Sequence, residues 1–447
     1  MTKLALSPLR CALLASGILA LLPLACSANQ DSDLFNASGG SGGEGGQGGS
    51  GGSGGTGWVT GGSGGNGGVN EGGIIGERVT LSGRVMAPSG AFPVSGALVF
   101  LTKEDLEPIP SGVYHYECDE MQGTPYALSK ADGTWTIENA PVGTWKLVTR
   151  KGNFRRVREI EVATGMDPNV HEELTTLPGS RTPDGLDMTP SFAVVKTSPD
   201  LTYDLLAKFG MGQVNASGEL VQGTESFHIY EDGGFSSYAH TSTLFENDNL
   251  HKYHMIFLPC YASSVGVPFV NNNLQKLRDY VSAGGRIYNS CTVSLWTEAP
   301  FPEYVDFYQD DAPTRFDIGR RTNTAYATKG TMLDPDLAAW MGVVTGSDPN
   351  NIAFQNGYVT IDATQEVNDG HGLEKDGFVV KPYTWVRDNG TYAGSPLMVT
   401  YNYDLGKVFY SVYETSSKTA AITPQEYVLL YVILEVGVCA NLPPEVK

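Results

Sequence analysis

Basic residues are scarce in this chain of 447 residues. Its 29 Lys and Arg stand against 49 Asp and Glu, which gives a formal net charge of −20 at pH 7. Proteins bind phosphate backbones through clustered Lys and Arg, so this balance argues against a nucleic-acid partner. The length predicts roughly two or three domains of ~150 residues each, which excludes a single small module.

Long apolar runs are also scarce, and the most prominent one lies at the N-terminus. Lys3 and Arg10 precede an apolar stretch from Ala12 to Ala25. This stretch is shorter than the ~20 residues that a membrane span needs, and no other stretch qualifies. A basic flank followed by ~7–15 apolar residues and small residues is typical of a secretory signal peptide. We therefore predict that residues 1–25 are a signal peptide and that the protein is exported.

The signal region ends in the sequence Pro-Leu-Ala-Cys at residues 23–26. It resembles a lipobox, the bacterial signal that places a diacylglycerol on the cysteine, although Pro23 stands where that pattern prefers leucine. The resemblance implies a lipid on Cys26 and, with Ser27 as the next residue, sorting to the outer membrane. Ordinary cleavage nearby is the alternative, and it would give a periplasmic or secreted protein.

Glycine is abundant, but only locally. Of the 55 glycines, 21 lie between Asp31 and Ile75, mostly in Gly/Ser repeats. Such repeats cannot bury enough apolar area to become ordered, and they behave as flexible coil. We predict that residues 26–76 are a disordered tether that lifts a globular body off the membrane. This interpretation explains the lipid signal and the glycine excess together.

Residues 77–177 alternate between apolar and polar positions in short segments. Examples are Arg78–Met86 and Ala97–Leu101, and turn signals lie at 132–133 and 141–143. Several such strands without a helical segment predict an all-β sandwich over this region.

Four motifs in the same region are shared with a known family: GRV at 83–85, PVSGALV at 93–99, ADGTW at 131–135 and PVGTW at 141–145. They resemble the carboxypeptidase regulatory-like family, whose fold is transthyretin-like. The resemblance implies an accessory domain, sometimes related to carbohydrate-binding folds, so a carbohydrate-binding module is one alternative function. We expect its two tryptophans in the core rather than on a sugar-binding surface; they are Trp135 and Trp145.

Residues 190–440 change to an alternation of strands and helices. Apolar strands are expected at 191–196, 227–230, 254–258, 286–290 and 407–412, with helical spacing over 201–209, 273–282 and 424–437. Repeated strand–helix units predict an α/β domain with a parallel sheet covered on both faces.

Three segments of this second region carry a further resemblance: YHMIFLPC at 253–260, LRDYVSAGGR at 277–286 and GKVFYS at 406–411. They resemble the class I glutamine-amidotransferase-like superfamily, which has a flavodoxin-like fold. Together with the tether and the sandwich, the combination looks like a group of uncharacterised bacterial lipoproteins.

Cys291 is the candidate catalytic residue of the second region. Amidotransferases place a cysteine on a strained, glycine-flanked turn directly after a strand. Cys291 follows the expected strand at 286–290, but no glycine flanks it. A thiolate nucleophile also needs a positioned base. The late histidine, His371, has a spacing unlike that of the family, and Glu414 occupies the place where related members often have histidine. We predict a degenerate site; a cysteine-dependent hydrolase or amidotransferase is the alternative.

Patterns for metal binding are lacking. His251 and His254 lead directly into a strand, along which side chains diverge. The acidic pairs lack the alternating acidic loop with glycine that a calcium hand requires. We therefore expect no metal site and no other cofactor.

Four cysteines lie outside the signal region, an even number that suggests disulfides in an exported chain, with three possible connectivities. Cys260 and Cys291 each follow a strand, and consecutive parallel strands would bring both to the same end of the sheet. This predicts a Cys260–Cys291 bridge, which would remove the candidate nucleophile. The remaining pair, Cys118 and Cys439, would then link the two domains.

Taken together, these patterns predict an exported lipoprotein at the outer membrane or cell surface, attached to the membrane through its lipid. Its role is expected to be non-catalytic binding or structure, with a polysaccharide or a protein as ligand.

Overall fold

The structure is a computed structural model that describes residues 76–114, 123–231, 237–260, 266–310, 318–368, 379–415 and 418–435. All of them fall within one unit, Gly73–Lys447. Several predictions concern residues outside the described ranges and stay predictions: the signal peptide, the tether up to residue 75, Cys26, Cys118, His371 and Cys439.

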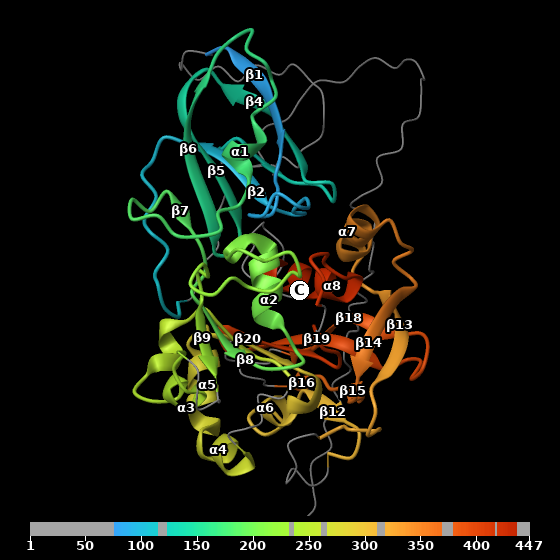
Figure 1. The fold of residues 1–447 in the computed structure, drawn as a ribbon. Helices are drawn as coiled ribbons and strands as arrows, with labels where there is room; N and C mark the ends of the chain where they lie inside the picture. Colours follow the sequence, from blue (N-terminus) through green and yellow to red (C-terminus); the bar gives the residue numbers. More distant parts are fainter. Residues whose placement is uncertain are drawn as a thin grey trace, which may run out of the picture. The chain divides into compact units, whose positions relative to one another are not determined.

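The first part of the described chain consists of antiparallel β-strands (Figure 1). β1 (Arg78–Arg84) pairs with β4 (Thr134–Pro141). The second sheet has the order β3-β2-β5-β6-β7, with β2 at Leu98–Thr102, β3 at Tyr126–Leu128, β5 at Gly143–Lys151, β6 at Phe154–Val162 and β7 at Asp187–Met188. β7 therefore adds a short strand beyond residue 177.

The core of this β part follows from the alternation of its strands. Successive side chains of a strand point to opposite faces, and in β4 this buries Trp135 and Ile137. Gly83 on β1 makes room for the indole, because a Cβ atom there would lie 2.7 Å from a ring atom of Trp135. The short helix α1 (Glu172–Thr175) packs against β1, β5 and β6. The transthyretin-like assignment stays a proposal.

The second part contains a nine-stranded sheet with the order β14-β13-β18-β19-β20-β11-β10-β8-β9. Five of these strands are parallel neighbours. They are β8 (Phe192–Lys196), β9 (His228–Glu231), β10 (Met255–Leu258), β11 (Arg286–Ser290) and β20 (Gly406–Ser411). Numbered along the chain, they lie side by side in the order 2-1-3-4-5, which is one of the two common orders of doubly wound sheets.

The sheet is mixed rather than parallel throughout, which corrects the expectation from the sequence. Four antiparallel strands extend it beyond β20: β19 (Pro396–Tyr403), β18 (Tyr383–Asp388), β13 (Tyr326–Met332) and β14 (Ile352–Gly357). The reason is the connections, because short turns join β18, β19 and β20, and a short turn can link only antiparallel strands. Two small sheets pair β12 (Val305–Phe307) with β15 (Ile361–Thr364) and β16 (Val367–Asn368) with β17 (Val379–Val380).

Helices lie on both sides of this sheet, with α2 and α8 on one side and α5 and α6 on the other (Figure 1). α5 (Leu274–Ser282) contacts β11 and β20 and buries Leu277, Tyr280 and Val281, whose spacing had predicted one apolar face. The other helices are α2 (Thr202–Leu206), η1 (Ala207–Met211), α3 (Thr241–Leu244), η2 (Asn249–Lys252), α4 (Val267–Asn272), η3 (Cys291–Val293), α6 (Leu295–Glu298), α7 (Pro335–Thr345) and α8 (Pro424–Glu435). Among the helices of the described residues, none combines the length and the apolar character needed to cross a membrane.

The β part and the mixed sheet share one hydrophobic core. Phe92, which follows β1, packs edge-on against Trp340 of α7 and Tyr427 of α8. The indole Nε1 of Trp340 donates a hydrogen bond of 2.8 Å to the carbonyl oxygen of Pro93. These contacts join segments that are 247 to 335 residues apart in the chain, because hydrophobic burial does not depend on sequence distance.

Candidate functional site

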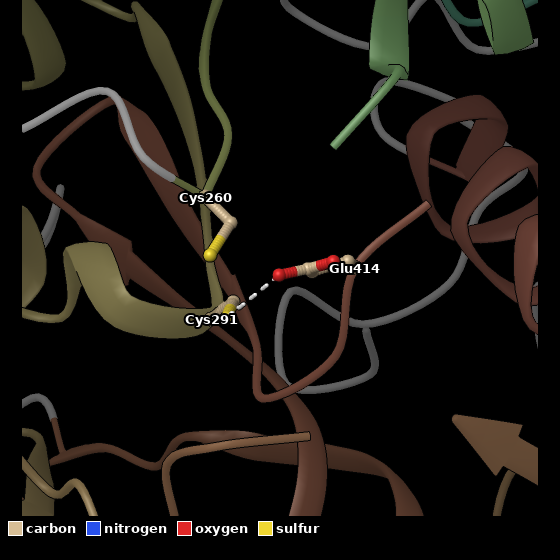
Figure 2. Close-up of side chains that lie close together, drawn as sticks. All are labelled: Cys260, Cys291 and Glu414. Atoms are coloured by element: carbon tan, nitrogen blue, oxygen red, sulfur yellow. Dashed lines mark hydrogen bonds between the residues drawn. The ribbon is translucent and has the colours of Figure 1, made fainter. Parts of the chain in front are cut away.

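Four acidic or thiol side chains follow the ends of neighbouring parallel strands. Asp200, Cys260, Cys291 and Glu414 lie one to four residues past the ends of β8, β10, β11 and β20, respectively. Because these strands are parallel neighbours, their carboxyl ends meet at one edge of the sheet. This edge is where open α/β sheets bind ligands. Figure 2 shows that the side chains of Cys260, Cys291 and Glu414 point toward one another.

Cys291 directly follows β11, where it is the first residue of η3 and lies in a strained turn. Its φ is +53°, in the left-handed region that residues other than glycine seldom adopt. The hydroxyl of Tyr410 donates a hydrogen bond to the carbonyl oxygen of Cys291 and so helps to hold the turn. The side chain is 0% exposed. The turn after the strand is therefore strained even without flanking glycines.

Cys260 is held by its backbone and by its sulfur. Its N–H donates to Asp200 Oδ2 at 3.1 Å and to Ser290 Oγ at 2.9 Å. The backbone N–H of Thr292 donates to Cys260 Sγ at 3.5 Å. The structure brings Cys260 and Cys291 together and holds both as free thiols, so the predicted bridge between them stays a prediction.

Glu414 brings a carboxyl group to the two thiols. The thiol of Cys291 donates to Glu414 Oε1 at 3.5 Å. The side chain of Gln425 donates to the carbonyl oxygen of Glu414 and accepts from the backbone N–H of Gln355 at 2.8 Å. Glu414 is 1% exposed. Its backbone is held by Gln425 and its side chain contacts Cys291, so the position of Glu414 after β20 is fixed.

Asp200 ties these strand ends together. Its Oδ1 accepts hydrogen bonds from the backbone N–H of Thr415 at 3.1 Å, from its hydroxyl at 2.6 Å and from Thr202 Oγ1 at 3.1 Å. Its Oδ2 accepts from Ser290 Oγ at 2.7 Å and from the N–H of Cys260. Asp200 was not predicted from the sequence. An acidic residue four positions after the first strand of a parallel sheet was the available signal.

Burial raises the pKa values of Glu414, Cys260 and Cys291. For Glu414, burial has the largest effect and the charge of Asp200 the next, and together they bring its pKa to about 7. Burial also raises the pKa of the Cys260 thiol, and it raises that of Cys291 well above its usual value, with contributions from Cys260 and Glu414. The desolvated charged forms are costly. Both thiols are therefore neutral near pH 7, and neutral thiols are poor nucleophiles.

Histidine does not assist these groups within the described residues, and His371 lies outside them. His254 immediately precedes β10 and so lies at the opposite, amino-terminal edge of the parallel strands. Its Nδ1 accepts a hydrogen bond of 2.8 Å from the N–H of Ser191. Burial, followed by the charges of Arg286 and Arg181, lowers the pKa of His254 to about 3. This imidazole is a neutral structural group.

A second polar feature lies beside the end of β8. A cavity of about 300 Å³ is lined by Lys196, Tyr203, Asp204 and Tyr238, among others. The Nζ of Lys196 lies 3.2 Å from Glu231 Oε1 and within 6 Å of the ring centres of Tyr203 and Tyr238. An amphipathic cavity with a fixed cation is suited to a small polar ligand.

The β part presents few exposed aromatic rings. Trp135 is buried, and the partly buried ring of Trp145 has the Nζ of Lys103 4.7 Å from its centre. Among the described aromatic residues, only Tyr126 is strongly exposed, at 45%. A row of stacking rings for a sugar chain is therefore not present in the described part of these sheets.

Comparisons with known proteins add little to this geometry. No family model matches the chain, and no curated protein matches it. Matching solved structures include the β-galactosidases of Rahnella sp. R3 (11% identity, TM-score 0.26) and Bacillus circulans sp. alkalophilus (10%, 0.26) and the exo-β-1,4-mannosidase Op5Man5 of Opitutaceae bacterium strain TAV5 (12%, 0.25). The matches cover 57%, 54% and 55% of this chain but only 33%, 30% and 36% of those structures. TM-scores this low carry no argument about fold or function.

Proposed function

We propose that the protein is exported, anchored in the outer membrane through a lipid on Cys26, and has a non-catalytic binding or structural role at the cell surface. The signal region and the Gly/Ser-rich tether support export and anchoring in the outer membrane. The globular body would be held near the membrane at a high local concentration, with the coil supplying reach. A polysaccharide or a protein of the envelope is the expected ligand.

The burial of Cys291 is the observation that supports the non-catalytic role most directly. A cysteine nucleophile must form a thiolate and must reach its substrate. Cys291 is fully buried, and burial raises the pKa of its thiol well above the usual value. Its polar contact is the carboxyl group of Glu414. Both requirements of a nucleophile are therefore opposed by the surroundings of this residue.

Alkylation of the native protein tests this role. We expect iodoacetamide near pH 7 to leave Cys260 and Cys291 unmodified in the folded, reduced protein and to modify both after unfolding in guanidinium. Peptide mapping identifies the modified positions, and a Cys291→Ser variant is the control for Cys291. Rapid modification of Cys291 in the native protein would overturn the proposal.

The proposed lipid anchor and localisation are tested separately. Metabolic labelling with a fatty acid should mark the wild-type protein and not the Cys26→Ala variant. Equal labelling of the two proteins would refute the lipid anchor and favour a periplasmic or secreted protein.

The cavity at the end of β8 supports the binding role, and we expect Lys196→Ala to weaken ligand binding without loss of folding.

The strained turn favours a second candidate, a cysteine-dependent hydrolase or amidotransferase. Cys291 has a φ of +53°, and its Sγ lies 3.5 Å from Glu414 Oε1, which would have to accept the thiol proton. Release of ammonia from glutamine by the purified protein, lost in Cys291→Ser, would establish this candidate. We expect no release above the buffer rate.

A further inference from the structure

The thiols of Cys260 and Cys291 and the carboxyl of Glu414 form a compact set of metal-ligating groups. One ligand atom from each lies within 4.8 Å of the other two, and all three side chains are buried. Among the described residues, this is the one such set of three or more His, Cys, Asp or Glu side chains. No metal site was expected from the sequence, because the histidine and carboxylate patterns do not match a metal motif and the two cysteines were expected to form a disulfide.

We propose that Cys260, Cys291 and Glu414 bind one thiophilic divalent cation of the Zn²⁺ class. The two sulfurs and one carboxylate oxygen supply three ligands, and a water or an external donor takes the fourth position. Thiolate sulfur selects zinc-like ions over magnesium and calcium, which prefer oxygen. In catalytic sites, zinc has three protein ligands, and its fourth position is exchangeable and holds water or a substrate. This inference does not rest on the proposed cell-surface role.

The distances fit this coordination. Zinc–sulfur bonds of about 2.3 Å and zinc–oxygen bonds of about 2.0–2.2 Å place ligand atoms about 3.5–3.8 Å apart in a tetrahedron. Cys291 Sγ and Glu414 Oε1 are 3.5 Å apart, and no pair in the set exceeds 4.8 Å. Side-chain adjustments of about 1 Å or less therefore complete the site, since the ligand distances already approach those of a tetrahedron.

The ligands are held by rigid elements. They follow β10, β11 and β20, which are adjacent in the sheet. Around them, Asp200 accepts the N–H of Cys260, the N–H of Thr292 donates to Cys260 Sγ, and Gln425 fixes the backbone of Glu414. Outer partners of this kind orient metal ligands and are characteristic of metal sites.

The charges around the set are acidic. The charged or thiol groups that most affect the pKa values of Cys260, Cys291 and Glu414 are these three groups themselves and Asp200. Buried acidic groups are normally paired with a cation or coordinate a metal. A divalent ion would supply the positive charge that the described side chains do not contribute here.

Metal binding and the Cys260–Cys291 bridge exclude each other. A disulfide has no thiolate to offer, so oxidation would leave only Glu414 as a ligand. The exported compartment favours oxidation of close thiols. The reduced protein is therefore the form that binds the cation.

Titration of the reduced full-length protein with Co²⁺ under argon tests the proposal, because Co²⁺ reports its ligands spectroscopically. We expect one Co²⁺ ion per chain, a sulfur-to-cobalt charge-transfer band in the near ultraviolet and tetrahedral bands in the visible. Addition of Zn²⁺ should remove the charge-transfer band and the visible bands. Cys260→Ser and Cys291→Ser should reduce or remove the charge-transfer band. Glu414→Gln should weaken binding at least about tenfold, the loss that even outer partners cause.

Glu426→Gln is the matched control, because Glu426 is equally buried but contacts no thiol among the described residues; it should bind Co²⁺ as wild type does. Should a cysteine variant fail to fold, the stabilisation of wild type by Zn²⁺ in a thermal melt, reversed by a chelator, takes its place. Binding without a charge-transfer band, or an unchanged band in a folded Cys291→Ser variant, would overturn the proposal. So would a reduced wild type that neither binds Co²⁺ nor is stabilised by Zn²⁺.

Discussion

Two buried glutamates, Glu414 and Glu426, lie near each other in the chain but in different electrostatic surroundings. Each is 1% exposed. Glu426 accepts hydrogen bonds from the N–H and hydroxyl of Thr423, as in a capping box, and its Oε1 lies 3.4 Å from the Nζ of Lys208. Glu414 contacts the thiol of Cys291.

The difference separates a structural acid from an acid available to a ligand. Lys208 is itself buried, so the charge of Glu426 is balanced inside the protein. The groups that act on Glu414 are acidic or thiol groups, which leave a proton or a metal ion to balance its charge. We therefore expect changes at Glu426 to act on stability and changes at Glu414 to act on metal binding.

Breaking the Lys208–Glu426 pair should have the largest effect on stability. Glu426→Gln leaves the buried ammonium of Lys208 without its carboxylate, which costs about 3–5 kcal/mol in comparable pairs. Urea unfolding measures the change. The double variant Lys208→Met/Glu426→Gln should lose less stability than Glu426→Gln alone, because neither position of the pair then carries a charge. A loss of stability below about 1 kcal/mol for Glu426→Gln would contradict this prediction, because it would be no larger than that of an exposed ion pair.

Asp200→Asn should have an intermediate effect that reaches both properties. The amide cannot accept all five hydrogen bonds that the carboxylate accepts, and a buried donor left unsatisfied costs about 1–3 kcal/mol. Because Asp200 orients Cys260, Co²⁺ affinity should also fall, by about 10–100-fold. Unfolding and titration on the same sample check both. Unchanged affinity in a destabilised variant would limit Asp200 to a structural role.

Glu414→Gln should change the stability of the metal-free protein by less than about 1 kcal/mol, the typical net value of one hydrogen bond. The glutamine keeps the shape of the side chain and leaves no described cation without a partner. Urea unfolding in the presence of a chelator gives the comparison with Glu426→Gln. A loss as large as that of Glu426→Gln would erase the distinction between the two glutamates.

A third buried acid, Glu298 at the end of α6, sharpens the comparison through pH. Burial, followed by the charges of Asp310, Asp306 and Glu303, raises its pKa from 4.5 to about 8. The folded protein retains this proton while the unfolded chain releases it, so this contribution to stability is complete below about pH 4.5 and is lost as the pH rises toward 8.

Glu298→Gln should therefore resemble wild type near pH 4, where Glu298 is protonated in both the folded and the unfolded chain, and should become relatively more stable as the pH rises toward 8. Urea midpoints across this range test it. The expected effect near pH 4 is the smallest of the four, because a protonated glutamate and a glutamine are both neutral there. Parallel pH profiles for the two proteins would show that Glu298 is ionised in the folded state.

The sequence predicts some of this site well and other parts poorly. Cys260 and Cys291 were expected at one end of the sheet because each follows an apolar strand, and consecutive parallel strands align such positions. Glu414 was named through the family resemblance, as the residue after the last strand at the place where related members often have histidine. Asp200 was missed, because its role depends on strand ends that are up to 215 residues apart in the chain.

The antiparallel half of the sheet was also missed. No motif appears in residues 303–400, and the pairing of β13 with β14 and β18 depends on partners 22 to 58 residues away in the chain. The positive φ of Cys291 carried no signal either, because no glycine marks the turn. Local periodicity predicted the five parallel strands, whereas pairing between segments distant in the chain determines the rest of the sheet.

Zinc K-edge X-ray absorption of the reduced, zinc-loaded protein tests the central claim most directly. A site formed by Cys260, Cys291 and Glu414 predicts two sulfur neighbours at about 2.3 Å and oxygen neighbours at about 2.0–2.2 Å. Glu426→Gln should give the same spectrum as wild type. A first shell of nitrogen and oxygen alone would contradict the claim, because it would place the metal away from the two cysteines.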